Sequence, residues 1–439
     1  MKIMKFGGTS VGKPERMHQV KDLITRDNQK KIVVLSALSG TTNALVGIGE
    51  ALAEANKDLA KERIESLHAH YLQFYRDLLK KDAARAKAEK IIKEHFEFLN
   101  IILKISFNEA INRDILAQGE LLSTKLFYTL LQELDIPAVF LPALDFMSID
   151  ENSEPELQKI SEKVKVILAN YPQDRIFITQ GYICKNHRNE VDNLKRGGSD
   201  YSASLIGAAV SAEVVEIWTD IDGMHNNDPR VVDRTRPIAQ LSFDEAAELA
   251  YFGAKILHPA SIWPAQQYNI PVKLLNTMEP DASGTTITAK EQGSGVKALA
   301  AKDGITAVKI KSSRMLLAYG FLRKVFEVFE KYRTSIDMIT TSEVAVSITI
   351  DDLTHLDDIV KELEAYGLVE VDKNQTIISV VGNMIAESKG TLAKIMNSLA
   401  DYPIRMVSYG GSRHNVSLLL DAKYKNDALK SMNEGLFEW

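Results

Sequence analysis

The first ten residues of this 439-residue chain combine a lysine with glycine and hydroxyl residues. Lys5 stands at the end of an apolar run, residues 1–6, that we expect to form a buried strand. Gly7, Gly8 and Ser10 follow in a predicted turn before a helix. Backbone N–H groups and the positive end of a helix dipole then point at one place, which suits a phosphate group. The spacing is not that of a Walker A loop, and these residues alone fit an ordinary structural turn equally well.

A second loop of the same kind lies further along the chain. Gly197 and Gly198 allow close approach of the backbone, and Ser199 is a residue type that caps helix N-termini. Arg196 stands beside them and can grip a carboxylate or a phosphate with two parallel hydrogen bonds. One such loop carries little information, but two of them favour a ligand with anionic groups.

Charged residues also follow two later predicted elements and interrupt a helix. One strand ends in Asp220, and Arg230 lies in a tight turn just beyond it, whereas Lys255 follows a glycine break. A surface position is the default interpretation for Arg230 and Lys255, and it weakens beside two phosphate-type loops. The pair Gly119 and Glu120 interrupts an apolar helix. Glu120 therefore either lies at the surface or meets a cation.

The elements between these loops must hold them in place. Apolar, β-branched runs predict strands at residues 1–6, 31–37, 136–141, 175–182, 214–223 and 271–276, with helices between most of them. This alternation predicts an α/β fold in which helices cover both faces of a mostly parallel sheet. Residues 44–112 form a helical excursion that could cover the site. Its histidines, including His95, are expected on the helix surface.

A run rich in Gly, Ser and Thr, residues 279–295, marks a domain boundary. Beyond it the predicted order is βαββαβ over residues 304–373 and again, without a last strand, over 374–439. We expect a strand at 296–301 to complete the second sheet, which nests the first module within the second. The predicted domains are a catalytic domain at 1–285, a linker with this strand at 286–303, and the two modules.

The composition is that of a soluble globular protein, with 53 Lys and Arg against 59 Asp and Glu. The net charge of −6 argues against a nucleic-acid partner. One cysteine, Cys184, excludes an internal disulfide, and no Cys/His cluster has zinc spacing, so no metal site is expected. No apolar run approaches the roughly 18 residues of a membrane span, and no export signal is evident. We expect a cytoplasmic protein without a membrane partner.

The motifs resemble those of the aspartate kinase family, and they follow one another in the same order. They occupy residues 5–10, 119–120, 196–200, 218–220, 228–230 and 255–259. Each is weak singly, whereas six in order are specific. The two βαββαβ modules resemble the paired ACT domains of that family, and the resemblance is strongest to its single-function, lysine-sensitive members. It implies an amino-acid kinase fold followed by two ferredoxin-like ACT modules.

The resemblance implies that ATP phosphorylates the side-chain carboxylate of L-aspartate. The product would be 4-phospho-L-aspartate, on the route to lysine, threonine and methionine. A carboxylate is already ionised at pH 7, so no general base is required. Catalysis would then consist of positioning and charge neutralisation, with Mg²⁺ bound mainly through the nucleotide.

The resemblance also implies individual roles for residues of the motifs. Lys5 would stabilise the transferring phosphoryl group, Arg196 would clamp an aspartate carboxylate, and Glu120 would pair with its amino group. His225 stands where relatives commonly carry a tyrosine. The catalytic residues would be Lys5 and Asp200; the nucleotide-binding residues Lys5, Gly7, Gly8, Ser10, Thr219, Asp220, His225, Arg230, Lys255 and Ile256; the substrate-binding residues Ser36, Thr42, Glu120, Arg196, Ser199 and Asp200.

Feedback inhibition, by lysine, is expected through the ACT modules. The effector residues implied are Met315, Ser335, Asp337 and Thr341. A homodimer, or a dimer of dimers, is expected to form through the same modules.

Two alternatives stay open at this point. One is another phosphotransferase of the amino-acid kinase fold, against which the tandem modules and the pair of Arg196 and Glu120 argue. The other is an amino-acid sensor with an inactive kinase domain. The charges of Lys5, Asp220 and Lys255 argue against a sensor, because it has no physical need for them.

Overall fold

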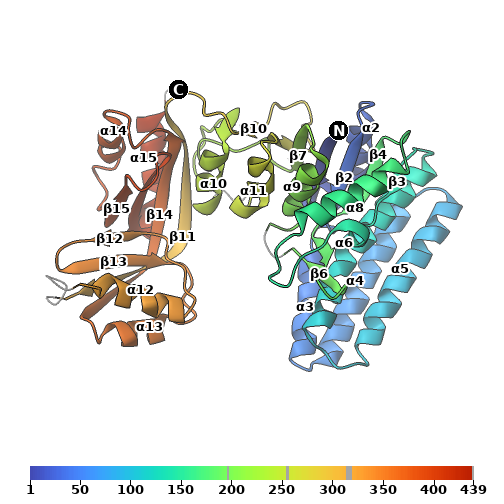
Figure 1. The fold of residues 1–439 in the computed structure, drawn as a ribbon, viewed down its shortest axis with the longest axis horizontal. Helices are drawn as coiled ribbons and strands as arrows, with labels where there is room; N and C mark the ends of the chain where they lie inside the picture. The colour runs from blue at the N-terminus through green and yellow to red at the C-terminus, as the bar shows by residue number, and fades with distance from the viewer. Residues whose placement is uncertain (195–196, 254–256, 313–318, 438–439) are drawn as a thin grey trace. The chain divides into compact units, whose positions relative to one another are not determined.

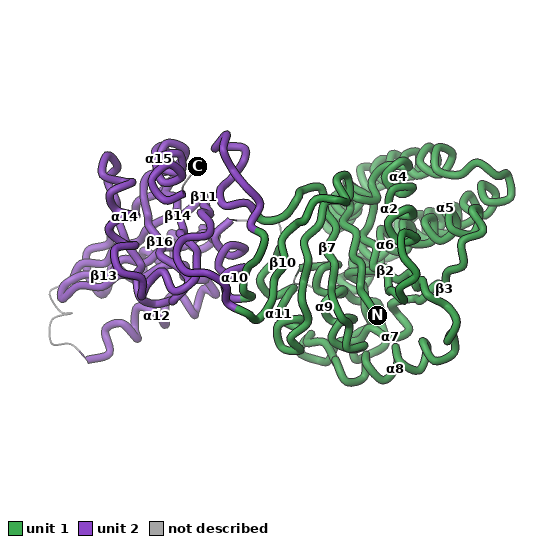
Figure 2. Tube along the Cα trace, turned by 90° about the horizontal axis from the view of Figure 1, so that it is seen from above, with its two compact units in different colours: residues 1–224, 239–243, 257–290 green, residues 225–238, 244–256, 291–439 purple. Residues whose placement is uncertain are grey.

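The computed structural model describes residues 1–194, 197–253, 257–312 and 319–437. The chain forms two compact units, coloured separately in Figure 2. Unit 1 comprises residues 1–224, 239–243 and 257–290, and unit 2 comprises residues 225–238, 244–256 and 291–439. None of the helices in the described ranges combines the length and the apolar character that crossing a membrane requires.

Unit 1 is built on an eight-stranded sheet with the strand order β3-β4-β2-β1-β7-β9-β10-β8 (Figure 1). Every neighbouring pair is parallel except β9 with β10. A separate two-stranded ribbon pairs β5 with β6. The strands are β1 (Lys2–Phe6), β2 (Lys31–Leu35), β3 (Val139–Phe140), β4 (Ile176–Gln180), β5 (Ile183–Lys185), β6 (Val191–Asn193), β7 (Val214–Thr219), β8 (Gln240–Ser242), β9 (Val272–Asn276) and β10 (Thr285–Thr288).

Helices cover both faces of this sheet. On one face Met4, Phe6 and Val33 share a core with the long helices α2 to α6. On the other, a methyl group added at Gly207 of α9 would come 2.7 Å from Val215, so α9 packs directly on β7. Strands β1, β2 and β4 are buried along their whole length, as expected for a parallel sheet covered on both sides. The helices are α1 (Gly8–Val11), α2 (Pro14–Thr25), α3 (Thr41–Ala53), α4 (Lys57–Leu78), α5 (Asp82–Ile102), α6 (Glu109–Glu133), α7 (Ala143–Phe146), α8 (Leu157–Ala169), α9 (Gly198–Val210) and α11 (Pro259–Gln267).

The predicted interruption at Gly119 and Glu120 is wrong, because α6 runs unbroken for 25 residues. Gly119 serves close packing instead: a Cβ there would come 2.7 Å from the Cβ of Ala37. The expected surface position of His95 is also wrong. Its Nδ1–H donates to Gln118 at 2.6 Å, and its Nε2 accepts from Lys125 at 2.8 Å. Burial and the charge of Lys125 lower the pKa of His95 to about 4, so the ring is neutral.

Unit 2 is built on a six-stranded antiparallel sheet with the order β12-β13-β11-β14-β16-β15. Helices α12 and α13 share a core with one half of the sheet, and α14 and α15 with the other half. The elements are α10 (Phe243–Tyr251), β11 (Gly295–Lys311), α12 (Phe321–Lys331), β12 (Ile339–Thr341), β13 (Ala345–Ile350), α13 (Leu356–Leu363), β14 (Leu368–Asn383), α14 (Thr391–Asn397), β15 (Met406–Tyr409), β16 (Asn415–Asp421), a 3₁₀ turn (Ala422–Tyr424) and α15 (Lys425–Leu436).

Two long strands run through both halves of this sheet. Residues 296–302 of β11 pair with 377–382 of β14, and residues 305–311 pair with 368–375. Irregular register separates the two stretches of β11. The strands predicted separately on either side of residues 303 and 373 are therefore continuous. The pairing of 296–301 is the one that nesting of the two modules requires.

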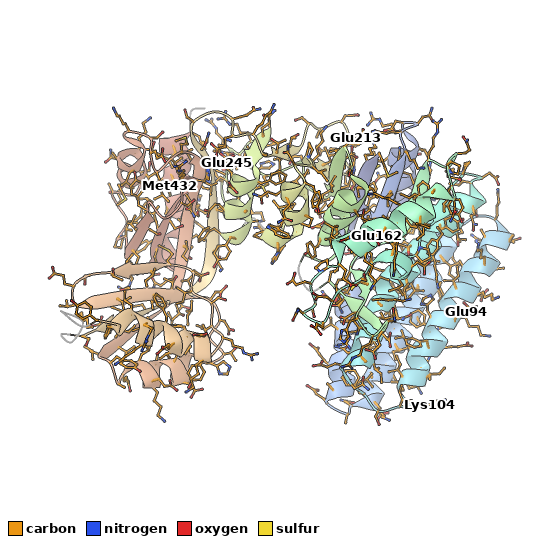
Figure 3. The ribbon with its side chains drawn as sticks, viewed as in Figure 1. Glu94, Lys104, Glu162, Glu213, Glu245 and Met432 are labelled. Atoms are coloured by element: carbon orange, nitrogen blue, oxygen red, sulfur yellow. The ribbon has the colours of Figure 1, made fainter. Side chains whose placement is uncertain are left out.

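Two segments before residue 285 pack within unit 2 rather than unit 1. Val232 lies in the core that contains Met432 of α15, labelled in Figure 3. The side-chain amide of Asn227 donates to the backbone of Leu429 at 3.2 Å. Glu245 of α10, also labelled, is fully buried and accepts from Lys297 at 2.7 Å. The boundary of the compact units thus differs from the single break expected from the glycine-rich run.

Candidate active site at the carboxyl edge of the parallel sheet

Four parallel strands of unit 1 end in register. Phe6 of β1 lies opposite Leu35 of β2 and Trp218 of β7, and Leu35 lies opposite Gln180 of β4. The residues that follow these strands therefore meet at one edge of the sheet. In open α/β sheets this carboxyl edge is where ligands bind.

Lys5 and Asp200 form an ion pair at this edge. The Nζ of Lys5 lies 2.6 Å from Oδ1 of Asp200, and both side chains are largely buried. Lys5 is the next-to-last residue of β1, and Asp200 lies in the first turn of the 13-residue helix α9. The structure thus brings together two residues that are 195 positions apart in the sequence.

The glycines after β1 hold the backbone close to Lys5. A Cβ at Gly7 would come 3.3 Å from Nζ of Lys5, and a Cβ at Gly8 would come 3.0 Å from the carbonyl oxygen of Ala37. Only a small residue keeps that space open. Ser10 is buried, with Oγ 2.7 Å from Oγ1 of Thr277, so its hydroxyl is used within the fold. Residues 8–11 form a short helix, α1, rather than the open turn predicted.

Glu120 is buried at the same edge, on the central part of α6. Its Oε1 accepts the backbone N–H of Ala37, the second residue after β2, at 3.2 Å. Its side chain forms no ion pair among the described residues. Burial raises the pKa of Glu120 to about 8, which favours the neutral carboxyl group at pH 7.

The remaining predicted substrate residues are placed as follows. Ser36 directly follows β2 and is partly buried, whereas Thr42 is exposed in the first turn of α3. Ser199 is buried but is not the N-cap that we predicted, because Gly197, with φ +67°, takes that position. The left-handed conformation at Gly197 suits glycine and not serine. Arg196 lies outside the described residues.

The residues predicted to bind the nucleotide belong to both units. In unit 1, Thr219 ends β7 and donates to the exposed Asp220 at 3.1 Å. In unit 2, the exposed Arg230 forms two parallel hydrogen bonds to Asp228, at 2.9 and 2.8 Å. Nδ1 of His225 lies 2.9 Å from Oγ1 of Thr235. Lys255 and Ile256 lie outside the described residues.

Tyr182 belongs to this edge and was missed as a site residue. It has φ +66°, a strained conformation for a bulky residue, and such strain concentrates at functional sites. Its N–H donates to Oγ of Ser202 at 2.8 Å, and its ring lies against Gly198. Burial, and then the charge of Glu120, raise its pKa to about 12, so its hydroxyl stays a donor.

A chain of hydrogen bonds joins this turn to the helix that carries Glu120. Gln180 donates to Thr124 at 3.0 Å, and Thr124 donates to the carbonyl of Glu120 at 2.6 Å. Gly181 fits against Ser199, where any Cβ would come 2.4 Å from the serine side chain. The sequence shows Gln-Gly-Tyr at the end of a strand, but this pattern alone does not indicate a functional site. The positive φ of Tyr182 does so, and it is visible only in the structure.

The predicted effector residues lie in unit 2. Ser335 and Thr341 are exposed. The carboxylate of Asp337 is buried and accepts from Lys302 at 2.7 Å and from Tyr251 at 2.9 Å. Met315 lies outside the described residues.

The edge therefore offers two complementary binding chemistries. Lys5, the glycine backbone and the start of α9 favour an anionic group. The buried Glu120, with its pKa raised to about 8, favours a cationic partner, because an opposite charge would stabilise its ionised form. A ligand that carries an ammonium group, placed beside an anionic donor group, satisfies both.

Comparison with known proteins agrees with this geometry. A model of the amino acid kinase family matches residues 1–276, and a model of the ACT domain matches residues 378–436. The lysine-sensitive aspartokinase 3 of Escherichia coli is 32% identical over 448 residues, which cover 99% of each chain.

Solved structures give the same result over the full length. The structure of E. coli aspartokinase III in complex with aspartate and ADP, an R-state, has a TM-score of 0.86 and 31% identity, and the match covers 100% of both chains. The T-state complex of that enzyme with lysine and aspartate has a TM-score of 0.83 and 32% identity, again over 100% of both chains. The predicted amino-acid kinase fold with ACT modules is confirmed, and the chain belongs to the aspartokinase family.

Proposed function

We propose that this protein transfers the γ-phosphoryl group of ATP to the side-chain carboxylate of L-aspartate. The observation that carries the proposal is the carboxyl edge of the sheet, where the ion pair of Lys5 and Asp200 lies with a buried Glu120 that forms no ion pair with any residue the structure describes. The ammonium group of aspartate would pair with the Glu120 carboxylate. Its ionised side-chain carboxylate is the nucleophile, so the protein needs cations rather than a general base.

Each residue at the edge has a role in this reaction. Lys5 stabilises charge on the transferring phosphoryl group, and Asp200 holds the Lys5 ammonium in place. Glu120 binds the amino group of aspartate, and Arg196 binds a carboxylate. Ser36, Thr42 and Ser199 complete the substrate pocket. We assign the nucleotide to Gly7, Gly8, Ser10, Thr219, Asp220, His225, Arg230, Lys255 and Ile256.

The nucleotide brings Mg²⁺ with it in this proposal. No group of three or more His, Cys, Asp or Glu side chains among the described residues is placed to hold a metal ion. Phosphate oxygens are therefore the main Mg²⁺ ligands in our assignment, where the ion neutralises charge.

Regulation and assembly follow from the C-terminal modules. The lysine sensitivity named for the E. coli relative, and its T-state complex with lysine, support feedback by lysine here. Met315, Ser335, Asp337 and Thr341 are the proposed effector residues, and the modules are the proposed contact between subunits. We keep the prediction of a cytoplasmic enzyme.

Trapping the product with hydroxylamine tests the activity. Purified protein with ATP, Mg²⁺ and L-aspartate should yield aspartyl hydroxamate and ADP in equal amounts. L-Glutamate and a nucleoside monophosphate in place of aspartate test for another kinase of this fold. Aspartate binding without any ADP would identify a sensor and contradict the proposal.

A further inference from the structure

A half-buried lysine in unit 1 has no part in the proposed reaction. Lys125 lies on α6, on the side that packs against α5, and its Nζ donates to Nε2 of His95 at 2.8 Å. Lys125 is partly exposed, whereas His95 is only 7% exposed. Lys125 forms no ion pair with a residue that the structure describes. Glu94, which precedes His95 and is labelled in Figure 3, pairs with Lys90 instead.

The orientation of His95 is fixed by a third side chain. The amide nitrogen of Gln118 donates to the backbone carbonyl of Asp114 at 2.9 Å, which turns the amide oxygen toward the ring. That oxygen lies 2.6 Å from Nδ1 of His95. Nδ1 therefore carries the proton, and the lone pair of Nε2 points at Lys125. Gln118 and Lys125 are about two helical turns apart on α6, so both face α5.

The arrangement is that of an activated nucleophile. Catalytic triads on unrelated folds share a base within hydrogen-bond distance of the nucleophile and a third group that orients the base. Here the amine of Lys125 takes the place of a serine or cysteine side chain, and Gln118 takes the place of the carboxylate. A structural ion pair would instead give the lysine a carboxylate partner, as α5 does for Lys90 and Lys93.

The surroundings of Lys125 disfavour its charged form. Buried apolar residues of both helices, among them Phe96 of α5 and Leu122 of α6, belong to one core. Burial lowers the pKa of Lys125, and the charge of Glu94 opposes this shift only in part. A lowered pKa increases the fraction of free amine at neutral pH, and the free amine is the nucleophilic form.

We propose that Lys125 is an acylation site, at which its amine takes an acyl group from an acyl phosphate. The nitrogen attacks the carbonyl carbon, the bond from that carbon to the phosphate oxygen breaks, and inorganic phosphate leaves with the electron pair. An amide forms. Of the three ammonium protons, one goes to solvent when the free amine forms, one passes through Nε2 of His95 to the departing phosphate, and one stays on the amide.

The base becomes stronger at the stage where it is needed. Burial holds the pKa of His95 at about 4, with the charge of Lys125 as the second cause. Once Lys125 is the free amine, that repulsion is absent, and protonation of the ring costs less. The attacking nitrogen becomes acidic as its bond to carbon forms, so the proton then moves to Nε2.

The class of donor follows from the reaction proposed for the carboxyl edge of the sheet, and this step rests on that function. 4-Phospho-L-aspartate is an acyl phosphate, so turnover would make an acylating agent for the amine. Acetyl phosphate carries the same reactive group and supplies it without turnover. The acylation site can therefore be tested separately from the kinase activity.

Incubation of the full chain with acetyl phosphate, followed by peptide mass spectrometry, tests the site. Lys125 should be acetylated at least about threefold faster than Lys93, because a lowered pKa increases the fraction of free amine. Lys93 is an exposed lysine of α5 whose ammonium pairs with Glu97, so it is the matched control within the same molecule. Acetylation of Lys125 that is no faster than that of Lys93 would overturn the proposal.

His95→Gln tests the base. It removes the imidazole and keeps a polar side chain, and it should slow the acetylation of Lys125 about tenfold without affecting Lys93. The thermal midpoint shows whether the variant folds; if it does not, the ratio of Lys125 to Lys93 in the parent protein decides. Unchanged acetylation of Lys125 in a folded His95→Gln protein would overturn the activation by His95.

Two further reactions identify the donor. Acetyl-coenzyme A, a thioester, should modify Lys125 more slowly than acetyl phosphate does, and faster modification by the thioester would overturn the assignment to acyl phosphates. ATP, Mg²⁺ and L-aspartate should attach an aspartyl group to Lys125 in the parent protein but not in Lys5→Ala. ADP release without an aspartyl group on Lys125 would overturn the protein's own product as the donor. Acetylation of Lys125 in a protein that releases no ADP would support the site and contradict the proposed function.

Discussion

Two buried carboxyl groups, Glu120 in unit 1 and Asp337 in unit 2, are stabilised in different ways. Glu120 has one backbone N–H and no ion pair among the described residues, and burial raises its pKa to about 8. Asp337 has an internal ammonium, that of Lys302, and a tyrosine hydroxyl. A buried charge without a partner costs free energy. Glu120 therefore favours its protonated form, whereas Asp337 pairs with the side chain of Lys302.

The different partners of the two carboxyl groups imply different modes of ligand binding. In our proposal the ligand brings an ammonium group to Glu120, which forms no ion pair among the described residues, and displaces its proton. At Asp337, a proposed effector residue, a ligand would compete with the Lys302 ammonium. The first arrangement suits a substrate that binds and leaves in each cycle. The second suits an effector whose affinity is set against an internal competitor.

The largest effect on activity is expected at another buried carboxylate, Asp200, which forms an ion pair with Lys5. Lys5→Ala removes that cation and should lower kcat about 10²- to 10³-fold, with a much smaller change in the KM for aspartate. Steady-state ADP release measures both constants. Lys2→Ala on the same strand, whose ammonium pairs with Asp27, is the control and should keep kcat within about threefold. A change confined to the aspartate KM would contradict the role of Lys5.

Glu120→Gln turns the proton-bearing carboxyl into a permanently neutral amide of the same shape. We expect the KM for aspartate to rise about 10- to 100-fold, because a charged hydrogen bond to the ligand ammonium is lost. Glu109→Gln, on the same helix but fully exposed, is the matched control and should have no measurable effect. If Glu120→Gln binds aspartate normally, the ammonium group is bound elsewhere.

The affinity for aspartate should also depend on pH. Below about pH 8 binding must displace the proton of Glu120, so the dissociation constant should fall by up to about tenfold per unit as the pH rises from 6 to 8, and then level off. Tyr182, with its pKa raised to about 12, does not titrate in this range. The same titration of Glu120→Gln should be flat. A dissociation constant of the parent protein that does not change with pH would mean that Glu120 is ionised before the substrate arrives.

The smallest effect is expected at the paired carboxylate. Tyr251→Phe keeps the ring beside Lys302 and removes one hydrogen bond to Asp337, so the free energy of unfolding should fall by about 1–2 kcal/mol. Denaturant unfolding followed with a probe in unit 2 measures it. Tyr268→Phe, at an exposed tyrosine of unit 1, is the control. An equal change in both variants would show that the hydroxyl of Tyr251 contributes nothing at Asp337.

The sequence predicted the elements whose signal is local. The apolar runs of β1, β2, β4 and β7 placed the strands, and the motifs after them placed Lys5 and Asp200 at strand and helix ends. The role of Glu120 was implied by the family resemblance, because its local sequence predicted a helix break where α6 is continuous. Gly119 has the residue type of a helix break, and only the packed Ala37 shows that it permits contact.

The errors share a physical cause, which is burial that local sequence does not reveal. His95 has the pattern of an exposed helix residue and is neutral inside the helical excursion. Tyr182 looked like a turn residue, and its positive φ is visible only in three dimensions. The contacts of Asp337 with Tyr251 and Lys302 join residues far apart in the sequence, so no periodic pattern could predict them.

Proton release on aspartate binding tests the account most directly. Calorimetric titrations at pH 7, in buffers that differ in ionisation enthalpy, count the protons that leave the protein. With the pKa of Glu120 at about 8, about 0.9 proton should leave per aspartate bound, and none should leave from Glu120→Gln. Binding of aspartate to the parent protein without proton release would contradict the claim that Glu120 is protonated before aspartate binds and ionised in the complex.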